Sequence, residues 1–293
     1  LLPYTTQLRR QALADHPPVT FCVPTRQGGA DETGRPHIVG LLETIAQLDY
    51  PMGKLRVIVG DDLADGTAYM QGPWPFTLSR IVTERERDEP VNYAEKMNRL
   101  WRLSETEQIV FLNDDVTGTA ADWLQALLTF SMQADVGGVS PRLLYPNSTI
   151  QHAGIPGGLF NLCAHAWLGR AAVKPTYQNW AVGHREWSMV TGAVFATRRS
   201  VLNEIDGFDE TFRLEFNDVD MCLRMKMLGY RIVYTRHAEL VHHERASRGQ
   251  TASPGSELAR FLKRWSENLA ADPMFHPLLD RESFALRPID ASS

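Results

Sequence analysis

The chain has 293 residues, of which 43% are hydrophobic and 22% are charged, so it is long enough to bury a sizeable core and has the composition of a soluble globular protein. Its formal net charge of -5 argues against a basic nucleic-acid-binding surface. No apolar run approaches the ~18 residues of a membrane-spanning helix, and the first residues do not resemble a signal peptide. We therefore expect a cytoplasmic protein without a nucleic-acid partner.

The three cysteines, Cys22, Cys163 and Cys222, are far apart in the sequence and form no CxxC pair. An odd number of widely spaced cysteines is typical of free thiols rather than of a disulfide framework. We predict that all three are unpaired.

Short β-rich runs alternate with helical stretches over the first 135 residues. We predict strands at residues 19–25, 55–60, 76–82 and 108–112, and helices at residues 38–48, 93–103 and 122–133. This alternation is typical of a doubly wound, mostly parallel α/β sheet, in which ligands bind beyond the carboxyl ends of the strands. The residues that follow three of the strands should therefore share one crevice: Pro24-Thr25, Asp61-Asp62 and Asn113-Asp114-Asp115.

The rest of the chain has a less regular pattern until residue 191. Residues 136–187 are rich in Gly, His and aromatic residues and indicate short strands and loops. Beyond them we predict a helix at 218–228 with Gly229 as a left-handed cap, a strand at 231–235, and a helix over 258–269. Because no linker separates the two halves, we expect one composite domain.

Two acidic clusters follow predicted strands, and each allows two interpretations. Asn113-Asp114-Asp115 is either a turn with helix-capping side chains or a site where Asp115 binds Mg²⁺ or Mn²⁺ beside a diphosphate. Asp61-Asp62 is either a similar turn or a carboxylate that accepts the imide N–H of uracil or thymine.

A third acidic group opens the helix predicted at 218–228. Asp218 and Asp220 are either first-turn acids favoured by the helix dipole, or a general base, Asp218, with Asp220 orienting the local backbone or an acceptor hydroxyl. His242 and His243, which follow the last predicted strand, are either packed histidines or the source of a metal ligand near Asp218.

The middle of the chain also contains an aromatic and histidine-rich group of residues: His152, His165, Trp167, Trp180 and Trp187. Most such residues pack in the core or in loops. The alternative is a carbohydrate platform, because apolar sugar faces stack on aromatic rings.

Several motifs, in this order, resemble the family-2 inverting glycosyltransferases of the GT-A fold: VTFCVPT, VIVGDDLADGT, VNYAEKMNRL, FLNDDV, TGAVFATRRSVLNEIDGFDETF, EFNDVDMCLRMKMLGY and AELVHHERASRG. The similarity covers residues 19–280, and the segment WSENLAADPMFHPLLD resembles the tail of a subgroup found in bacterial O-antigen and rhamnan-type polysaccharide assembly. It implies a GT-A fold, with a Rossmann-like nucleotide-binding half fused to an acceptor-binding half around a mostly parallel central sheet flanked by helices.

The resemblance also implies a domain organisation, with one GT-A domain at 19–280 between an N-terminal extension, 1–18, and a C-terminal tail, 281–293. Within the domain, residues 19–135 would bind the nucleotide sugar, residues 136–250 would hold the acceptor and catalytic groups, and residues 251–280 would form a C-terminal helix and tail.

The resemblance further implies roles for individual residues. Asp218 is expected to be the catalytic base, and Asp115 and His242 are expected to bind Mn²⁺ or Mg²⁺. The nucleotide-binding residues are expected to be Pro24, Thr25, Asp62, Asn98 and Asp114. The acceptor-binding residues are expected to be Thr191, Gly192, Asp220 and Trp187.

The sequence departs from the family pattern at three places. The first position of the aspartate motif is Asn113, the usual Glu-Asp base pair reads Asn217-Asp218, and the loop at residues 26–37 is long and Gly-rich.

The expected reaction moves a sugar from a UDP- or dTDP-sugar to a saccharide or lipid-linked saccharide acceptor, for bacterial surface polysaccharide. Association with the inner face of the membrane or with a larger assembly enzyme is left open. Two alternatives also remain at this point, a nucleotidyltransferase and an inactive glycan-binding domain of a larger assembly protein.

Overall fold

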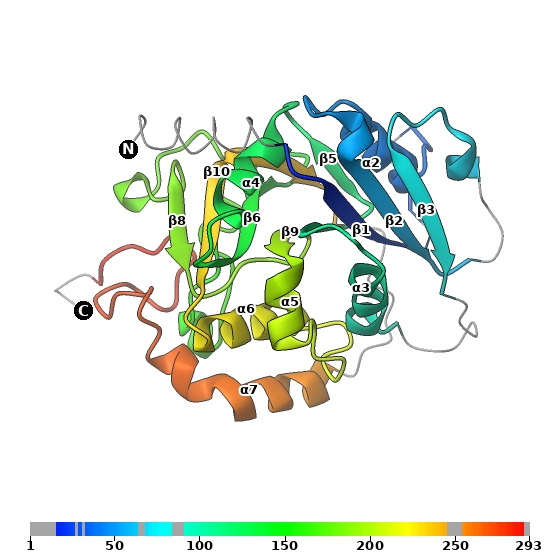
Figure 1. Ribbon diagram of the computed structural model, residues 1–293. Helices are drawn as coiled ribbons and strands as arrows, with labels where there is room; N and C mark the ends of the chain where they lie inside the picture. The colour runs from blue at the N-terminus through cyan, green and yellow to red at the C-terminus, as the bar shows by residue number, and fades with distance from the viewer. Residues whose placement is uncertain are drawn as a thin grey trace.

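The computed structural model describes residues 16–26, 29–30, 33–63, 68–83, 91–244 and 254–289. Much of the predicted N-terminal extension, parts of the 26–37 loop and the end of the predicted tail lie outside these ranges. Within them, one ten-stranded sheet has the strand order β3-β2-β1-β4-β9-β6-β10-β5, with β7 paired to β6 and β8 paired to β10 (Figure 1).

The first half of the sheet is parallel, as the alternation of strands and helices predicts. β1 pairs with β2 and β4, and β2 pairs with β3, all in parallel. These strands are β1 (Val19–Thr25), β2 (Leu55–Asp61), β3 (Thr77–Val82) and β4 (Gln108–Leu112). β1 and β4 are almost wholly buried on both faces, which explains their continuous apolar sequences.

The second half of the sheet is mixed rather than parallel. β9 lies between β4 and β6 and runs antiparallel to both, whereas β6 and β10 are parallel to each other. The strands of this half are β5 (Val116–Gly118), β6 (Val136–Leu144), β7 (Ile150–His152), β8 (His184–Trp187), β9 (Val194–Arg198) and β10 (Arg231–His242). The long irregular segment before β9 replaces a helical crossover, so the chain enters β9 from the opposite end.

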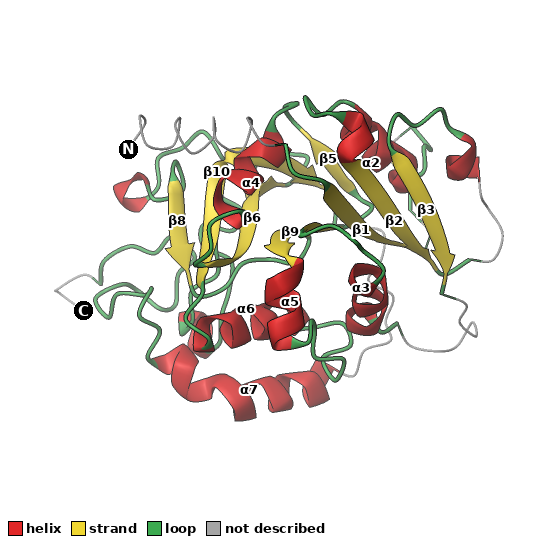
Figure 2. Cartoon of the chain, viewed as in Figure 1, coloured by secondary structure: helices red, strands yellow, loops and turns green. Residues whose placement is uncertain are grey.

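Helices cover both faces of the sheet (Figure 2). One apolar core lies between the sheet and α2 (His37–Ala46) and α4 (Trp123–Ser131). The other core includes residues of α3 (Tyr93–Arg102), α5 (Arg199–Ile205), α6 (Asn217–Met227) and α7 (Pro254–Ala270). Short 3-10 helices lie at Met52–Lys54, Ala68–Gln71, Leu159–Asn161 and Tyr177–Asn179.

Two local features of the second half position the site. Gly229 has a φ of 87°, as expected for the left-handed cap that ends α6 before β10. β10 does not stop at residue 235, because an irregularity between Thr235 and Glu239 lets the strand resume its pairing with β6 and continue to His242.

The three cysteines are free, as predicted, with Cys22 and Cys222 buried. Within the described ranges, no helix has the length and apolar character needed to cross a membrane.

Candidate active site

The turns after β1, β2 and β4 converge on one crevice. The Thr25 hydroxyl donates a hydrogen bond to Asp114 Oδ2 at 2.6 Å, and the Asp62 amide donates to the Thr25 carbonyl at 3.2 Å. Burial raises the pKa of Asp114 to about 6, and the Thr25 hydrogen bond only partly opposes this rise. Pro24, on the same strand, is half-buried beside them.

The two acids after β2 have different surroundings. Asp61 is fully buried and accepts hydrogen bonds from the Tyr69 hydroxyl at 2.9 Å and from Arg80 Nε at 2.9 Å, so it holds the turn together. Asp62 accepts from the Thr83 hydroxyl at 2.7 Å through Oδ1 and forms an ion pair with Lys96 of α3. Among the described residues, Asp62 Oδ2 is buried without a hydrogen-bond partner.

Asp115 and His242 are in direct contact. Asp115 Oδ1 lies 3.1 Å from His242 Nε2, and both side chains are largely buried. The contact follows from the pairing of β5 with β10, in which Val116 is opposite His242. Burial raises the pKa of Asp115, but the hydrogen bond from His242, together with the charges of His242 and His37, outweighs it, so the pKa is lowered overall.

Only one of the two adjacent histidines faces Asp115. His243 instead pairs its Nε2 with the Thr117 hydroxyl at 2.7 Å and donates its backbone amide to the Asp115 carbonyl at 3.0 Å. Successive side chains of a strand point to opposite faces, which explains the difference. His242 Nδ1 lies 2.7 Å from Gln151 Oε1, a partner that the sequence motifs did not single out.

The Asp115–His242 pair has the chemistry and spacing of two ligands to one divalent cation. Two neighbouring positions of an octahedral ion, each about 2.1 Å from the metal, are about 3.0 Å apart, close to the observed 3.1 Å. In the part of the chain that is described, no cluster of three or more His, Cys, Asp or Glu side chains forms a complete metal site.

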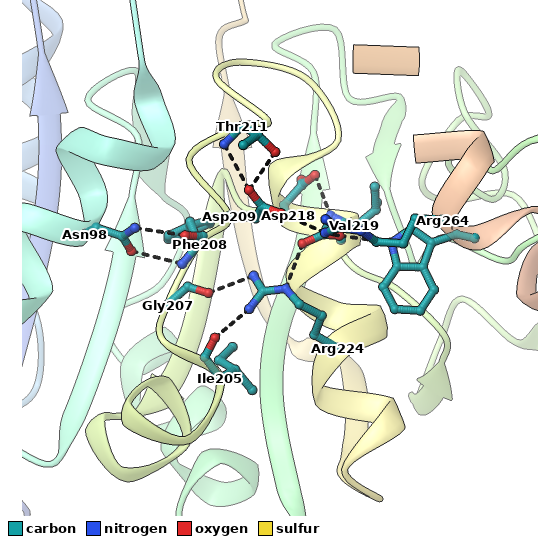
Figure 3. A network of polar contacts seen from close by, with 12 residues as sticks. Asn98, Ile205, Gly207, Phe208, Asp209, Thr211, Asp218, Val219, Arg224 and Arg264 are labelled. Carbon is teal, nitrogen blue, oxygen red and sulfur yellow. Dashed lines mark hydrogen bonds and ion pairs between the residues drawn. The ribbon is translucent and has the colours of Figure 1, made fainter. Parts of the chain in front are cut away.

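Asp218 is held at the start of α6 by two backbone amides. Its Oδ2 accepts from Gly192 at 2.7 Å. Its Oδ1 accepts from the amide of Val219, the next residue, at 2.8 Å (Figure 3). A Cβ at Gly192 would lie 3.0 Å from the Cβ of Asp218, so the absence of a side chain allows this approach. The neighbouring Thr191 is buried and accepts from the Ala193 amide at 3.3 Å.

The segment 191–193 links Asp218 to the acidic cluster after β4. Its Gly192 amide binds Asp218, and its Ala193 carbonyl accepts from the Asn113 amide at 2.9 Å. The sequence-predicted base and the sequence-predicted metal-binding acid therefore lie in the same part of the molecule.

Asp220 lies on the other side of α6 from this crevice, because two residues correspond to about 200° of helical rotation. It is fully buried and accepts from Arg224 Nε at 2.7 Å, Arg264 Nη1 at 2.8 Å and Trp265 Nε1 at 2.9 Å. Figure 3 shows how Arg224 continues this network to the carbonyls of Ile205 and Gly207. Asp220 thus orients the local backbone, and its buried carboxylate has no free approach for an acceptor hydroxyl.

Two other sequence-predicted site residues are also buried in the fold. Asn98 donates to the Phe208 carbonyl and accepts from the Phe208 amide, each at 2.9 Å, so it ties α3 to the turn before α6. Trp187 is fully buried, with its ring centroid 6.0 Å from that of the equally buried Trp167. A sugar needs an exposed ring face for stacking, so these two rings do not form a carbohydrate platform.

Tyr93 is a candidate site residue that the motifs contained but that we did not single out. Its hydroxyl is buried and has no hydrogen-bond partner among the described residues. Its pKa is raised above the usual range, first by burial and then by the negative charge of Asp218, with a smaller contribution from Asp115. Both carboxylates therefore lie within electrostatic reach of an unpaired hydroxyl, a signal that only the three-dimensional structure provides.

The described architecture has clear similarities to known proteins. Residues 17–268 match the family described as glycosyltransferase like family 2. An uncharacterized protein, y4gI, from Sinorhizobium fredii is 34% identical over 207 residues, which are 67% of this chain and 23% of that protein. The O-antigen biosynthesis protein RfbC of Myxococcus xanthus is 29% identical over 273 residues, which are 90% of this chain and 20% of that protein. The chain thus spans about a fifth to a quarter of the length of these relatives.

Solved structures of glycosyltransferases share the fold. The mannosyltransferase PcManGT from Pyrobaculum calidifontis, in complex with GDP-Man and Mn²⁺, superposes with a TM-score of 0.58 at 20% identity and covers 94% of this chain and 75% of its own. GalNAc-T7, with UDP, GalNAc and Mn²⁺, gives a TM-score of 0.62 at 11% identity, covering 86% of this chain and 48% of its own. The predicted GT-A fold is therefore confirmed, and the chain belongs to glycosyltransferase family 2.

Proposed function

We propose that this chain transfers a sugar, with inversion, from a UDP- or dTDP-sugar to a hydroxyl of a saccharide or lipid-linked saccharide acceptor. The observation that carries the proposal is the arrangement of Asp218 and the Asp115–His242 pair: the segment 191–193 contacts Asp218 and also Asn113, which lies two residues before Asp115. A displacement at an anomeric carbon needs a base for the incoming hydroxyl and a group that stabilises the departing diphosphate. The two parts of the site supply these two functions.

Asp218 is the proposed general base. Each of its oxygens accepts one backbone amide, which fixes the orientation of the carboxylate at the start of α6. The acceptor hydroxyl loses its proton to Asp218 while its oxygen forms a bond to the anomeric carbon. The bond between that carbon and the diphosphate oxygen breaks, and the nucleoside diphosphate leaves with the bonding electrons.

Asp115 Oδ1 and His242 Nε2 are the proposed ligands of a divalent cation, Mn²⁺ or Mg²⁺. When bound, such an ion would neutralise the charge of the diphosphate. Support comes from their 3.1 Å separation and from the Mn²⁺ in the two structures of similar fold. Asn113, the departure in the aspartate motif, contacts His242 Nε2 at 3.4 Å through its amide and leaves the Asp115–His242 pair intact.

Thr25, Asp62 and Asp114 are the proposed walls of the nucleoside pocket, together with Pro24. The unpaired Oδ2 of Asp62 suits the imide N–H of uracil or thymine, since Lys96 and Thr83 hold the carboxylate in place. The RfbC relative, an O-antigen biosynthesis protein, supports a place for the reaction in surface polysaccharide assembly. A nucleotidyltransferase would use a phosphate-binding loop after β1, but it gives no role to Asp218 or His242.

The test is to incubate the purified chain with a panel of nucleotide sugars, Mn²⁺ or Mg²⁺, and saccharide acceptors. We expect metal-dependent release of nucleoside diphosphate and formation of a glycosylated product. Asp115→Ala should abolish metal-dependent nucleotide binding, measured by calorimetry, without unfolding the protein. Release of pyrophosphate would favour the nucleotidyltransferase, and metal-dependent nucleotide binding without turnover on any acceptor would favour the inactive domain.

A further inference from the structure

Gln151 lies between His242, the last residue of β10, and Glu244, two residues further along the chain. It belongs to β7, which pairs with β6, and its side chain is largely buried. Its Oε1 lies 2.7 Å from His242 Nδ1, across 91 residues of sequence, and its Nε2 donates to Glu244 Oε2 at 2.9 Å.

These two contacts determine which ring nitrogen of His242 carries a proton. A carboxylate accepts hydrogen bonds, so Glu244 engages the NH₂ end of the Gln151 amide and leaves the oxygen end toward His242. An amide oxygen can only accept, so Nδ1 of His242 must be the protonated nitrogen. Nε2, which lies 3.1 Å from Asp115 Oδ1, donates to that carboxylate when it carries a proton; when it does not, the proton on Nδ1 leaves the lone pair of the ring on Nε2.

We propose that Gln151 is a positioning residue, which holds His242 in the Nδ1–H form and turns its Nε2 lone pair toward the cation shared with Asp115. The inference rests on the proposed metal-binding role of His242 and adds a residue that acts through that ligand. Partners of this kind fix the tautomer and the orientation of a metal-binding histidine, and their loss typically lowers metal affinity by about 10–100-fold.

Gln151→Met is the main variant, because it keeps an unbranched side chain and removes the acceptor. Gln125→Met is the matched control, since Gln125 is also a buried glutamine but lies in α4, where its amide donates to the Asp49 carbonyl. His242→Ala separately tests the metal-binding role of the ring. All variants are made in the full chain.

The first measurement is ¹⁵N NMR of His242 in the metal-free protein, at a pH at which the ring is neutral. The second is titration of Mn²⁺ in the presence of a nucleoside diphosphate. We expect a single Nδ1–H tautomer in the unaltered chain and in Gln125→Met. In Gln151→Met we expect mixed tautomers and an affinity for Mn²⁺ that is about 10–100-fold lower.

The possible failures are distinguishable. If His242→Ala binds Mn²⁺ as tightly as the unaltered chain, the proposed metal ligand is wrong, whatever the tautomer of His242. If His242→Ala loses Mn²⁺ but Gln151→Met keeps both the single tautomer and an affinity within threefold, Gln151 only fills space and the inference is wrong. Equal losses of Mn²⁺ affinity in Gln151→Met and Gln125→Met would also overturn it, because they would indicate a general loss of packing.

Discussion

The Asp218 carboxylate accepts one backbone amide on each oxygen, whereas Asp220, two residues later, accepts three side-chain donors and is closed to solvent. Both acids occupy the first turn of α6, where the helix dipole favours a negative charge. Their neighbours nevertheless assign them to different tasks. Asp218 faces the segment 191–193, and Asp220 joins α6 to α7.

Substitution of each acid by Asn should separate these tasks. Asp218→Asn places an NH₂ group against a backbone N–H, so we expect a loss of about 1–3 kcal/mol in the free energy of unfolding. Its rate of transfer should fall by about 10²–10⁴, because the base is lost, while donor affinity stays within a few-fold. Asp220→Asn should lose about 1.5–3 kcal/mol of stability and show the smaller loss of rate.

Urea denaturation and steady-state kinetics at saturating substrates measure the two effects. If Asp218→Asn retained more than about a tenth of the transfer rate, another residue would be the base.

Tyr93→Phe tests the unpaired hydroxyl near the two carboxylates. Because that hydroxyl has no partner among the described residues, its removal should leave the free energy of unfolding unchanged or raise it by about 1 kcal/mol. If the hydroxyl binds the ligand, kcat/KM should fall by about tenfold, the equivalent of one hydrogen bond. Tyr50→Phe is the control, since the Tyr50 hydroxyl donates to the Pro17 carbonyl at 2.6 Å, so its loss should lower stability and leave kcat/KM unchanged. Unaltered kcat/KM in Tyr93→Phe would remove this residue from the site.

Sequence motifs identify the region of a functional site more reliably than they identify the individual residues that contact a ligand. The apolar pattern of the sequence shows where the strands end and where a helix starts. It therefore predicts that Asp115, His242 and Asp218 lie close together. The burial of Asn98, Asp220 and Trp187 is not visible in that pattern, because it depends on partners far away in the sequence. Three unpredicted contributors have the same explanation, since each depends on a distant contact: Tyr93, Lys96 and Gln151.

At the scale of elements, α7 supports the loop that leads into α6. Glu257, in the first turn of α7, accepts the backbone amides of Arg213 at 3.2 Å and Glu215 at 2.8 Å. Arg264 and Trp265 of the same helix bind Asp220. α7 thus contacts both the loop that precedes Asp218 and the first turn of α6, which contains Asp218.

Glu257→Gln should weaken this support, because its amide nitrogen cannot accept an N–H. We expect the free energy of unfolding to fall by about 1–3 kcal/mol and kcat to fall several-fold, with nucleotide affinity unchanged. Glu267→Gln is the control, since Glu267 is an exposed acid further along α7. Thermal unfolding, calorimetry and kinetics provide the three measurements. A kcat equal to that of the control would mean that α7 contributes stability alone.

Elements with an uninterrupted apolar pattern could be predicted closely, and β1 and β4 have the predicted bounds. β10 could not, because Arg236 and His237 interrupt its pattern at the irregularity, beyond which pairing with β6 resumes. The central place of β9 was also not predictable. It depends on the route of the irregular segment before it, and nothing local in the sequence specifies that route.

At the scale of the whole molecule, the sheet separates two apolar cores. His152 is fully buried, and its ring makes an edge contact with the ring of Tyr234. Burial lowers the pKa of His152 well below its usual value, and the neighbouring His165 adds to the effect. The unfolded chain therefore binds a proton near pH 6.5 that the folded chain does not bind.

This difference predicts how global stability depends on pH. The contribution of His152 to the free energy of unfolding is fully present above pH ~6.5. It is lost as the pH falls, by at most about 1.4 kcal/mol per pH unit. His152→Gln should flatten the dependence of the free energy of unfolding on pH between about 6.5 and 5. His276→Gln, which changes an exposed histidine, is the control. Urea denaturation across this pH range is the measurement, and equal slopes in His152→Gln and the unaltered chain would contradict the prediction.

The tripeptide 191–193 makes its two connections, to Asp218 and to Asn113, with main-chain atoms of its own. Substitutions in the surrounding loops can therefore reshape the space for a sugar while these main-chain contacts keep the distance between Asp218 and Asn113 constant. In the proposed reaction, the shape of the sugar-binding space can therefore change independently of the positions of the catalytic groups. Under the proposed function, selection could then change the substrate of such a domain without changing its catalytic residues.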